Sequence, residues 1–165
     1  MVDQLPEELR ALKTQMKSFI NDVVVPCEPE LMNEDANADL VAEELKENAK
    51  KSGLWALGHP SEIGGGGLPF MDFVYLNEVI GRSHWGQWAV GSLSMQDSIM
   101  LHLYASDEQR ERFLTPLVAG EIYPSVGLTE PEVAGSDPTQ MQTTAVLDGD
   151  DWVINGHKWF TSGAK

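Results

Sequence analysis

The sequence is poor in cysteine and in basic residues. Its 165 residues include one cysteine, Cys27, and 11 Lys and Arg against 26 Asp and Glu, which gives a formal net charge of −15. A lone cysteine cannot form an internal disulfide, and no Cys/His group has the spacing of a zinc site. Binding to nucleic acid or to an anionic membrane surface needs clustered Lys and Arg. We therefore expect no metal site, no nucleic-acid partner and no polybasic membrane contact.

Long apolar runs are also missing. No stretch approaches the roughly eighteen consecutive apolar residues of a membrane-spanning helix, so none is expected. The N-terminal residues 1–8 are acidic and resemble neither a secretory signal nor a basic transit peptide, which predicts a cytoplasmic protein. A hydrophobic content of 42% with five Trp and five Phe is nevertheless sufficient for a folded core.

Apolar side chains recur at helical spacing through the first 120 residues. The pattern predicts helices over 6–24, 38–52, 69–80 and 88–104, and a fifth that begins at a capping box of Ser106 and Gln109 and ends near Pro116. Pro26 and Pro29 are expected to end the first helix. The fourth helix is apolar on most faces, so we expect it to be the buried one.

After Gly120 the apolar period changes to two, as in strands. The pattern predicts strands over 123–129, 142–147, 152–154 and 157–161, with tight turns at residues 148–150 and at Asn155-Gly156. Four short strands leave both edges of a sheet open, so we expect the β part to be incomplete. The fold class is α+β, with a helical domain over 1–120 and an antiparallel β domain over 121–165.

Three other patterns could indicate a site but have simpler explanations. The glycine run in residues 63–69 lacks the Lys-Ser/Thr end of a P-loop and follows no strand, which favours a close-packed connector. Cys27 lies between prolines after an apolar helix and is expected to be buried and unreactive. The four histidines lie far apart, which favours structural or surface roles over metal binding: they are His59, His84, His102 and His157.

Residues 127–137 have the composition of a ligand-binding loop. They read Gly-Leu-Thr-Glu-Pro-Glu-Val-Ala-Gly-Ser-Asp, a strand end followed by a proline and then small residues. Such a loop can bring backbone N–H groups and hydroxyls to an anionic or flat polar ligand. An ordinary loop between strands is the alternative.

The motif Gly-Leu-Thr-Glu-Pro with Ala-Gly-Ser-Asp resembles the first signature of the acyl-CoA dehydrogenases. The later motif Asn-Gly-His-Lys-Trp-Phe-Thr-Ser-Gly, residues 155–163, is similar to that family's second flavin-contacting strand. The loop after Glu130 departs from the usual pattern, with Pro131, Glu132 and Val133 where the family has two residues. The resemblance implies an N-terminal helical domain followed by the start of an antiparallel β-barrel, with 121–165 as an incomplete part of it.

The resemblance also implies FAD as cofactor and oxidation of the Cα–Cβ bond of an acyl-CoA thioester. The implied flavin contacts are Val126, Leu128, Thr129, Gly135, Ser136, Trp159, Phe160 and Thr161. Ser136 is also implied to contact the CoA arm of the substrate, and the helix around residues 93–99 to floor the acyl pocket. The family's proton-abstracting glutamate lies in a C-terminal domain, so no catalytic residue is assigned and this chain alone is expected to be inactive.

The implied partners are an acyl-CoA substrate, an electron-transfer flavoprotein or similar acceptor, and further copies of the same chain in a dimer or tetramer. Two alternatives stay open. An acyl-CoA oxidase or a flavin monooxygenase shares this fold, and a non-catalytic split subunit would use the same segments for assembly.

Overall fold

The computed structural model describes residues 5–164, which divide into two units, one ending at Ile122 and one beginning at Tyr123. Residues 1–4, which bear on the expected absence of a leader, and Lys165 lie outside the described residues. The observed class is helical followed by antiparallel β, which confirms the predicted fold class.

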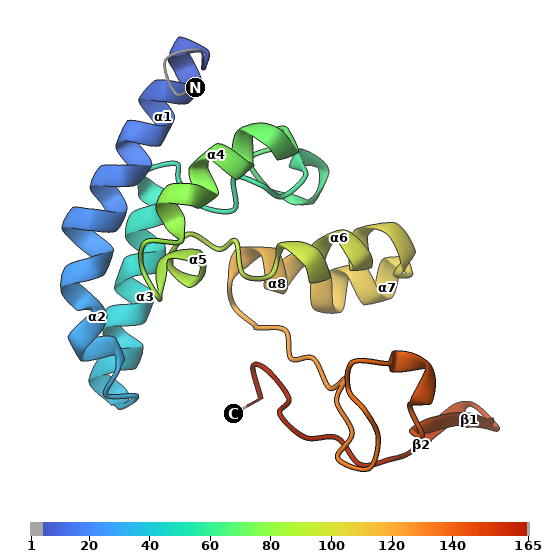
Figure 1. The fold of residues 1–165 in the computed structure, drawn as a ribbon. Coiled ribbons are helices and arrows are strands. Elements are labelled where there is room, and N and C mark those ends of the chain that lie inside the picture. The colour runs from blue at the N-terminus through green and yellow to red at the C-terminus, as the bar shows by residue number, and fades with distance from the viewer. Residues whose placement is uncertain (1–4, 165) are drawn as a thin grey trace. The chain divides into compact units, whose positions relative to one another are not determined.

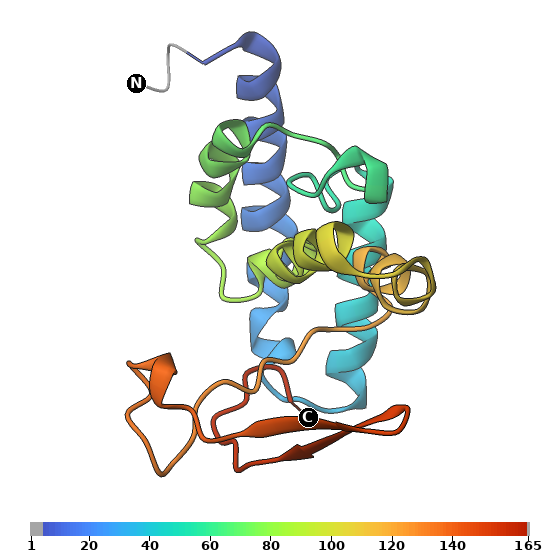
Figure 2. The ribbon, with the colours of Figure 1, turned by 90° about the vertical axis from the view of Figure 1, so that its right-hand side faces the viewer.

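The first unit is built on long helices that lie side by side (Figure 1). Helix α1 (Glu7–Ser18), the π-helical segment η2 (Phe19–Val24) and α2 (Val25–Leu31) form one continuous helix, and α3 (Ala36–Lys51) lies against it. Helix α4 (Phe70–Ile80) packs on α1. The short helices that follow include α6, which crosses the direction of α1 and α3 (Figure 2). They are α5 (Gly86–Ala89), α6 (Met95–Tyr104), α7 (Asp107–Gln109), η4 (Arg110–Leu114) and α8 (Thr115–Ala119).

The core of this unit comes from the apolar stripes of the long helices. Residues at helical spacing on α1, η2, α2, α3 and α4 are removed from solvent and contact one another. The best buried of them are Met16, Ile20, Val24, Leu31, Leu45, Ala49, Leu76 and Ile80, each at most 2% exposed.

The two predicted helix ends at prolines are wrong for the same physical reason. A helical turn before each proline widens to π geometry, with the Val25 N–H bonding the Ile20 carbonyl and the Thr115 N–H bonding the Arg110 carbonyl. Pro26 and Pro116 come directly after these wide turns, as the second residues of α2 and α8, and Pro29 lies inside α2. The chain therefore stays helical to Leu31 and to Ala119.

The predicted helix over 88–104 is divided, and it is not the buried one. The chain leaves helical geometry after Ala89 and passes through Gly91, whose φ is +70°, before α6 begins at Met95. In α6 only Ser98 is fully buried, while Leu103 and Tyr104 are 60% and 82% exposed. The apolar content of this segment predicted a buried helix, but the described part of the chain does not cover it.

The described residues of the second unit form one antiparallel hairpin. Strand β1 (Thr144–Asp148) pairs with β2 (Asp151–Asn155), with Val146 opposite Val153, and Gly149 takes a φ of +62° in the turn. This confirms the predicted turn at residues 148–150. A short 3-10 turn, η5 (Pro138–Gln140), precedes the hairpin. All ten strand residues are exposed, because the described part of the second unit supplies no second layer on either face of the hairpin.

The other two predicted strands do not form. Residues 123–129 contribute one isolated bridge, from Val126 to Ser162, and residues 157–161 are irregular, with Phe160 at a φ of +47°. Gly156 lacks the positive φ of a hairpin turn. A glycine is nevertheless required at this position, because a Cβ there would lie 2.6 Å from Cβ of Thr143. Close approach of another segment thus explains the glycine that the Asn-Gly pattern attributed to a turn.

None of the helices described is long and apolar enough to cross a membrane.

Candidate functional site

Two segments of the second unit that are far apart in sequence run side by side. The Val126 N–H donates to the Ser162 carbonyl at 3.1 Å, and the Trp159 N–H donates to the Thr129 carbonyl at 3.1 Å. The Lys158 ammonium donates to the Leu128 carbonyl at 2.9 Å. The structure therefore brings together six of the eight residues predicted to contact flavin: Val126, Leu128, Thr129, Trp159, Phe160 and Thr161.

These two segments carry exposed apolar and aromatic side chains, which together we call the apolar face: Val126, Leu128, Trp159 and Phe160. Val126 and Leu128 are 52% and 50% exposed, and Phe160 is 85% exposed. The rings of Trp159 and Phe160 meet edge to face with their centroids 5.2 Å apart. Phe160 has a positive φ, a strained conformation for a bulky residue that is common at functional sites.

Polar groups at the same place have no partner within the described chain. Neither the Leu128 N–H nor the hydroxyls of Thr129 and Thr161 make a hydrogen bond to any described residue. Uncommitted donors beside an apolar aromatic face suit a flat heterocycle with polar edges, such as the flavin ring. The residues present are therefore chemically compatible with FAD.

The remaining two predicted contacts lie on the loop that follows. A Cβ on Gly135 would lie 3.2 Å from Cγ2 of Thr129, so the loop passes close to the Thr129 side chain. Ser136 is exposed, and next to it Asp137 accepts hydrogen bonds from the Thr139 N–H and hydroxyl and from the Gln140 amide. Those bonds, first the one from the Thr139 hydroxyl, hold the pKa of Asp137 below its usual value. They fix the end of the loop that presents Ser136.

Glu130 is a residue of this site that the motif analysis did not assign. It is 3% exposed and accepts hydrogen bonds from the Gln142 N–H at 2.6 Å, from the Thr143 N–H and hydroxyl, and from the Lys158 ammonium at 2.9 Å. Bonds from the Thr143 hydroxyl, the Gln142 N–H and Lys158 hold the pKa of Glu130 at about 2. The sequence offered one indication of this pair, namely a glutamate in the middle of the loop motif and a lysine in the second motif.

One residue of the longer loop, Glu132, also has a partner. Glu132 lies on the surface with its Oε1 2.8 Å from Nδ1 of His157, the residue that precedes Lys158. Both side chains are more than half exposed. The longer loop is thus connected to the same second segment, by a solvent-exposed pair of a kind that contributes little to stability.

The first unit holds a separate pocket of about 340 Å³ between the glycine-rich loop and α6. Met95 and Ile99 line it, whereas Leu93, also expected near the acyl chain, is half exposed and lies outside it. The remaining lining residues belong mostly to the loop and the start of α4: Gly58, Pro60, Ser61, Glu62, Gly67, Leu68 and Phe70. A mostly apolar hollow of this size suits a small apolar group.

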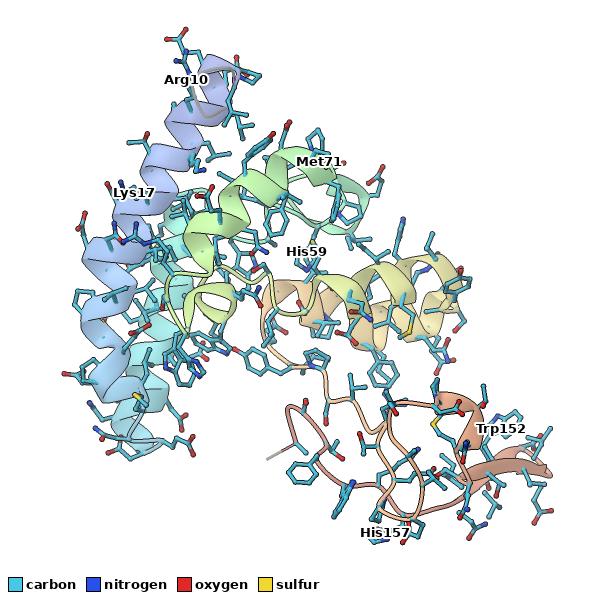
Figure 3. The ribbon with its side chains drawn as sticks, in the orientation of Figure 1. Arg10, Lys17, His59, Met71, Trp152 and His157 are labelled. Carbon is cyan, nitrogen blue, oxygen red and sulfur yellow. The ribbon has the colours of Figure 1, made fainter. Side chains whose placement is uncertain are left out.

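The glycine-rich loop is a close-packed connector. A Cβ on Gly66 would lie 2.8 Å from Cα of Leu57, and the Gly67 N–H donates to the His59 carbonyl. His59 itself is fully buried between α4 and the start of α6 (Figure 3), with Nε2 3.4 Å from the Ser94 hydroxyl. Burial lowers the pKa of His59, so the imidazole is neutral and supports the loop.

The described residues hold no group of three or more His, Cys, Asp or Glu that could bind a metal ion. Cys27 is half-buried, and burial, followed by the charges of Glu30 and Glu44, raises the pKa of its thiol. A thiol with a raised pKa is a poor nucleophile.

Both units match domains of known proteins. Residues 6–121 match the model of the acyl-CoA dehydrogenase N-terminal domain, and residues 125–165 match that of the acyl-CoA dehydrogenase middle domain. The chain is 37% identical over 172 residues to acyl-CoA dehydrogenase family member 10 of Mus musculus, with 96% of this chain and 16% of that protein covered.

Solved structures agree with these matches. A Mycobacterium abscessus protein assigned to the acyl-CoA dehydrogenases superposes with a TM-score of 0.84 at 35% identity, over 96% of this chain and 43% of its own. An acyl-CoA dehydrogenase from Bacillus anthracis, solved with FAD, superposes with a TM-score of 0.67 at 26% identity, over 94% of this chain and 26% of its own. The chain thus spans less than half the length of each of these relatives. With both of its units matched in order, the chain belongs to the acyl-CoA dehydrogenase family.

Proposed function

We propose that the protein carrying this chain removes hydrogen from Cα and Cβ of an acyl-CoA thioester with FAD as cofactor. When bound, FAD supplies the acceptor for the hydride from Cβ, and the α-proton leaves to a base. The observation that supports this proposal is the exposed apolar face with uncommitted donors, formed where the two motif segments are hydrogen-bonded to each other. No acid in residues 1–165 is assigned as the base.

In this proposal the chain binds and orients the cofactor. The Leu128 N–H and the Thr129 hydroxyl donate to the pyrimidine side of the ring, where such bonds stabilise the charge of the reduced form. Trp159 packs against the ring, and the Thr161 hydroxyl donates near N5. These roles fit donors that no described residue uses.

The loop and the pocket serve the substrate and the rest of the cofactor. Gly135 and Ser136 contact the pyrophosphate region, and Ser136 also contacts the CoA arm. The hollow lined by Met95 and Ile99 holds the acyl group. An electron-transfer flavoprotein or a similar acceptor then removes the electrons, and the protein works as a homodimer or homotetramer.

The test is FAD titration of the native protein that carries this chain, followed by anaerobic addition of an acyl-CoA. We expect FAD to quench tryptophan fluorescence and the acyl-CoA to bleach the flavin, with the 2-enoyl-CoA as product. Thr161→Val should weaken FAD binding by about threefold to tenfold through loss of one hydrogen bond. Thr144→Val, at an exposed position on β1, is the matched control and should change nothing.

Two outcomes would contradict the proposal. Failure of the native protein to bind FAD would favour a non-catalytic assembly role. Fast reoxidation of the reduced flavin by oxygen would instead favour an acyl-CoA oxidase.

A further inference from the structure

A buried carboxylate links three separate segments of the second unit. Glu130 lies in the loop motif, its backbone donors Gln142 and Thr143 precede β1, and Lys158 follows β2. The side chain of Glu130 is 2% exposed and that of Lys158 is 25% exposed, so water competes little for these bonds. The two carboxylate oxygens together accept four hydrogen bonds.

The lysine extends this network to the backbone beside the apolar face. The Lys158 ammonium donates both to Glu130 and to the Leu128 carbonyl, at 2.9 Å each. Directly next to these contacts, the Trp159 N–H bonds the Thr129 carbonyl. The ion pair therefore lies directly beside the two segments that carry the apolar face, residues 126–129 and 159–162.

Few other contacts hold these segments together. Neither segment forms a regular strand, and their backbones share the Val126–Ser162 and Trp159–Thr129 hydrogen bonds. Val126, Leu128 and Trp159 are still about half exposed and Phe160 is 85% exposed, so burial accounts for only part of the spacing. The charged network supplies the further contacts that fix the spacing.

We propose that Glu130 and Lys158 are positioning residues that hold segments 126–129 and 159–162 at the spacing FAD needs, an inference that rests on the proposed function. They do not touch the ring in this proposal. They act through Leu128, Thr129 and Trp159, whose backbone they fix.

Substitutions distinguish this positioning role from a general effect of removing a negative charge from the loop. In Glu130→Gln an amide NH2 replaces one of the two acceptor oxygens. At the Oε2 position it faces the Gln142 N–H, and at the Oε1 position it faces the Thr143 N–H and the Lys158 ammonium, so in either orientation a donor meets a donor. Lys158→Met keeps the aliphatic chain but removes both bonds of the ammonium, whereas Lys158→Arg keeps a cation. Glu132→Gln is the matched control, since it changes an exposed glutamate two residues away whose partner, His157, adjoins Lys158.

The first measurement is amide hydrogen exchange without cofactor. Glu130→Gln and Lys158→Met should accelerate exchange of the Val126 and Trp159 amides by about tenfold or more, as loss of a hydrogen bond to a charged group predicts. The amides of the β1–β2 hairpin should keep their rates, which shows that the unit is still folded. Lys158→Arg should restore part of the protection, and Glu132→Gln should match the wild type.

The second measurement is FAD affinity of the same variants in the native protein. Glu130→Gln and Lys158→Met should raise the Kd for FAD by about tenfold or more, with Lys158→Arg between them and the wild type. If Glu130→Gln does not fold, Thr143→Val takes its place; it removes the hydroxyl donor alone and should give a smaller effect in the same direction.

Unchanged exchange at Val126 and Trp159 would overturn the inference, and so would faster exchange with an unchanged Kd. If the wild type binds no FAD, the proposed function fails together with the cofactor half of the inference. The exchange rates still decide in that case whether the ion pair holds the two segments.

Discussion

A methyl group added at Gly91 should destabilise the helical unit far more than the same change at Gly53. Both glycines have left-handed backbones, with φ of +70° and +68°, so alanine carries a similar conformational cost of about 1–2 kcal/mol at each. At Gly53 no atom lies within 4 Å of the added Cβ. At Gly91 the Cβ would lie 2.6 Å from Cε2 of Trp55.

Trp55 cannot move away without losses of its own. Its Nε1 donates to the Val118 carbonyl at 2.8 Å, and the ring also lies close to Gly120, where a Cβ would lie 2.6 Å from Cζ2. Overpacking against such a fixed group costs about 1–3 kcal/mol. We therefore expect Gly53→Ala to lower the free energy of unfolding by about 1–2 kcal/mol and Gly91→Ala by about 2–5 kcal/mol.

Urea denaturation followed by far-UV circular dichroism measures both values. The same substitutions in a Trp55→Leu background complete a double-mutant cycle. The smaller leucine side chain removes the clash, so the destabilisation caused by Gly91→Ala should then approach that caused by Gly53→Ala. Equal destabilisation by the two alanines in the wild-type background would refute the claim that the indole is held in place against Gly91.

Two further predictions concern pH. The pKa of Glu130 is lowered from 4.5 to about 2, so its contribution to the stability of the second unit is complete above pH 4.5 and is lost as the pH falls toward 2. The protection of the Trp159 amide against hydrogen exchange should follow this pH profile, and Glu130→Gln should abolish the pH dependence. The pKa of His59 is lowered from 6.5 by burial, so the unfolded state binds a proton that the folded state does not; the free energy of unfolding of the first unit should decrease as the pH falls through 6.5, and a His59→Gln variant that keeps this slope would contradict the assignment.

Features that depend on neighbouring residues in the sequence were predicted well. Helices α3 and α4, the capping box of Ser106 and Gln109, and the turn at Gly149 are confirmed. Each depends on side chains within a turn or two of one another. The π turns before Pro26 and Pro116 were not predictable in this way, because a proline alone indicates a helix end and the preceding turn decides whether it is one.

Strands and burial depend on partners that local pattern does not identify. Residues 123–129 and 157–161 alternate like strands but form only one bridge, and α6 is apolar yet largely exposed. The roles of the predicted flavin contacts stay predictions. Their placement on adjacent segments follows from hydrogen bonds between residues distant in the chain.

By itself the sequence determined the family, the order of a helical and a β part, and the two motifs that supply the candidate site, because these depend on residue identity and spacing. Only the tertiary structure decided that Glu130 is buried and paired with Lys158, 28 residues away, and that Glu132 reaches His157, 25 residues away. The physical reason is that a carboxylate leaves water only where enough donors converge on it, and those donors come from segments that meet only after folding.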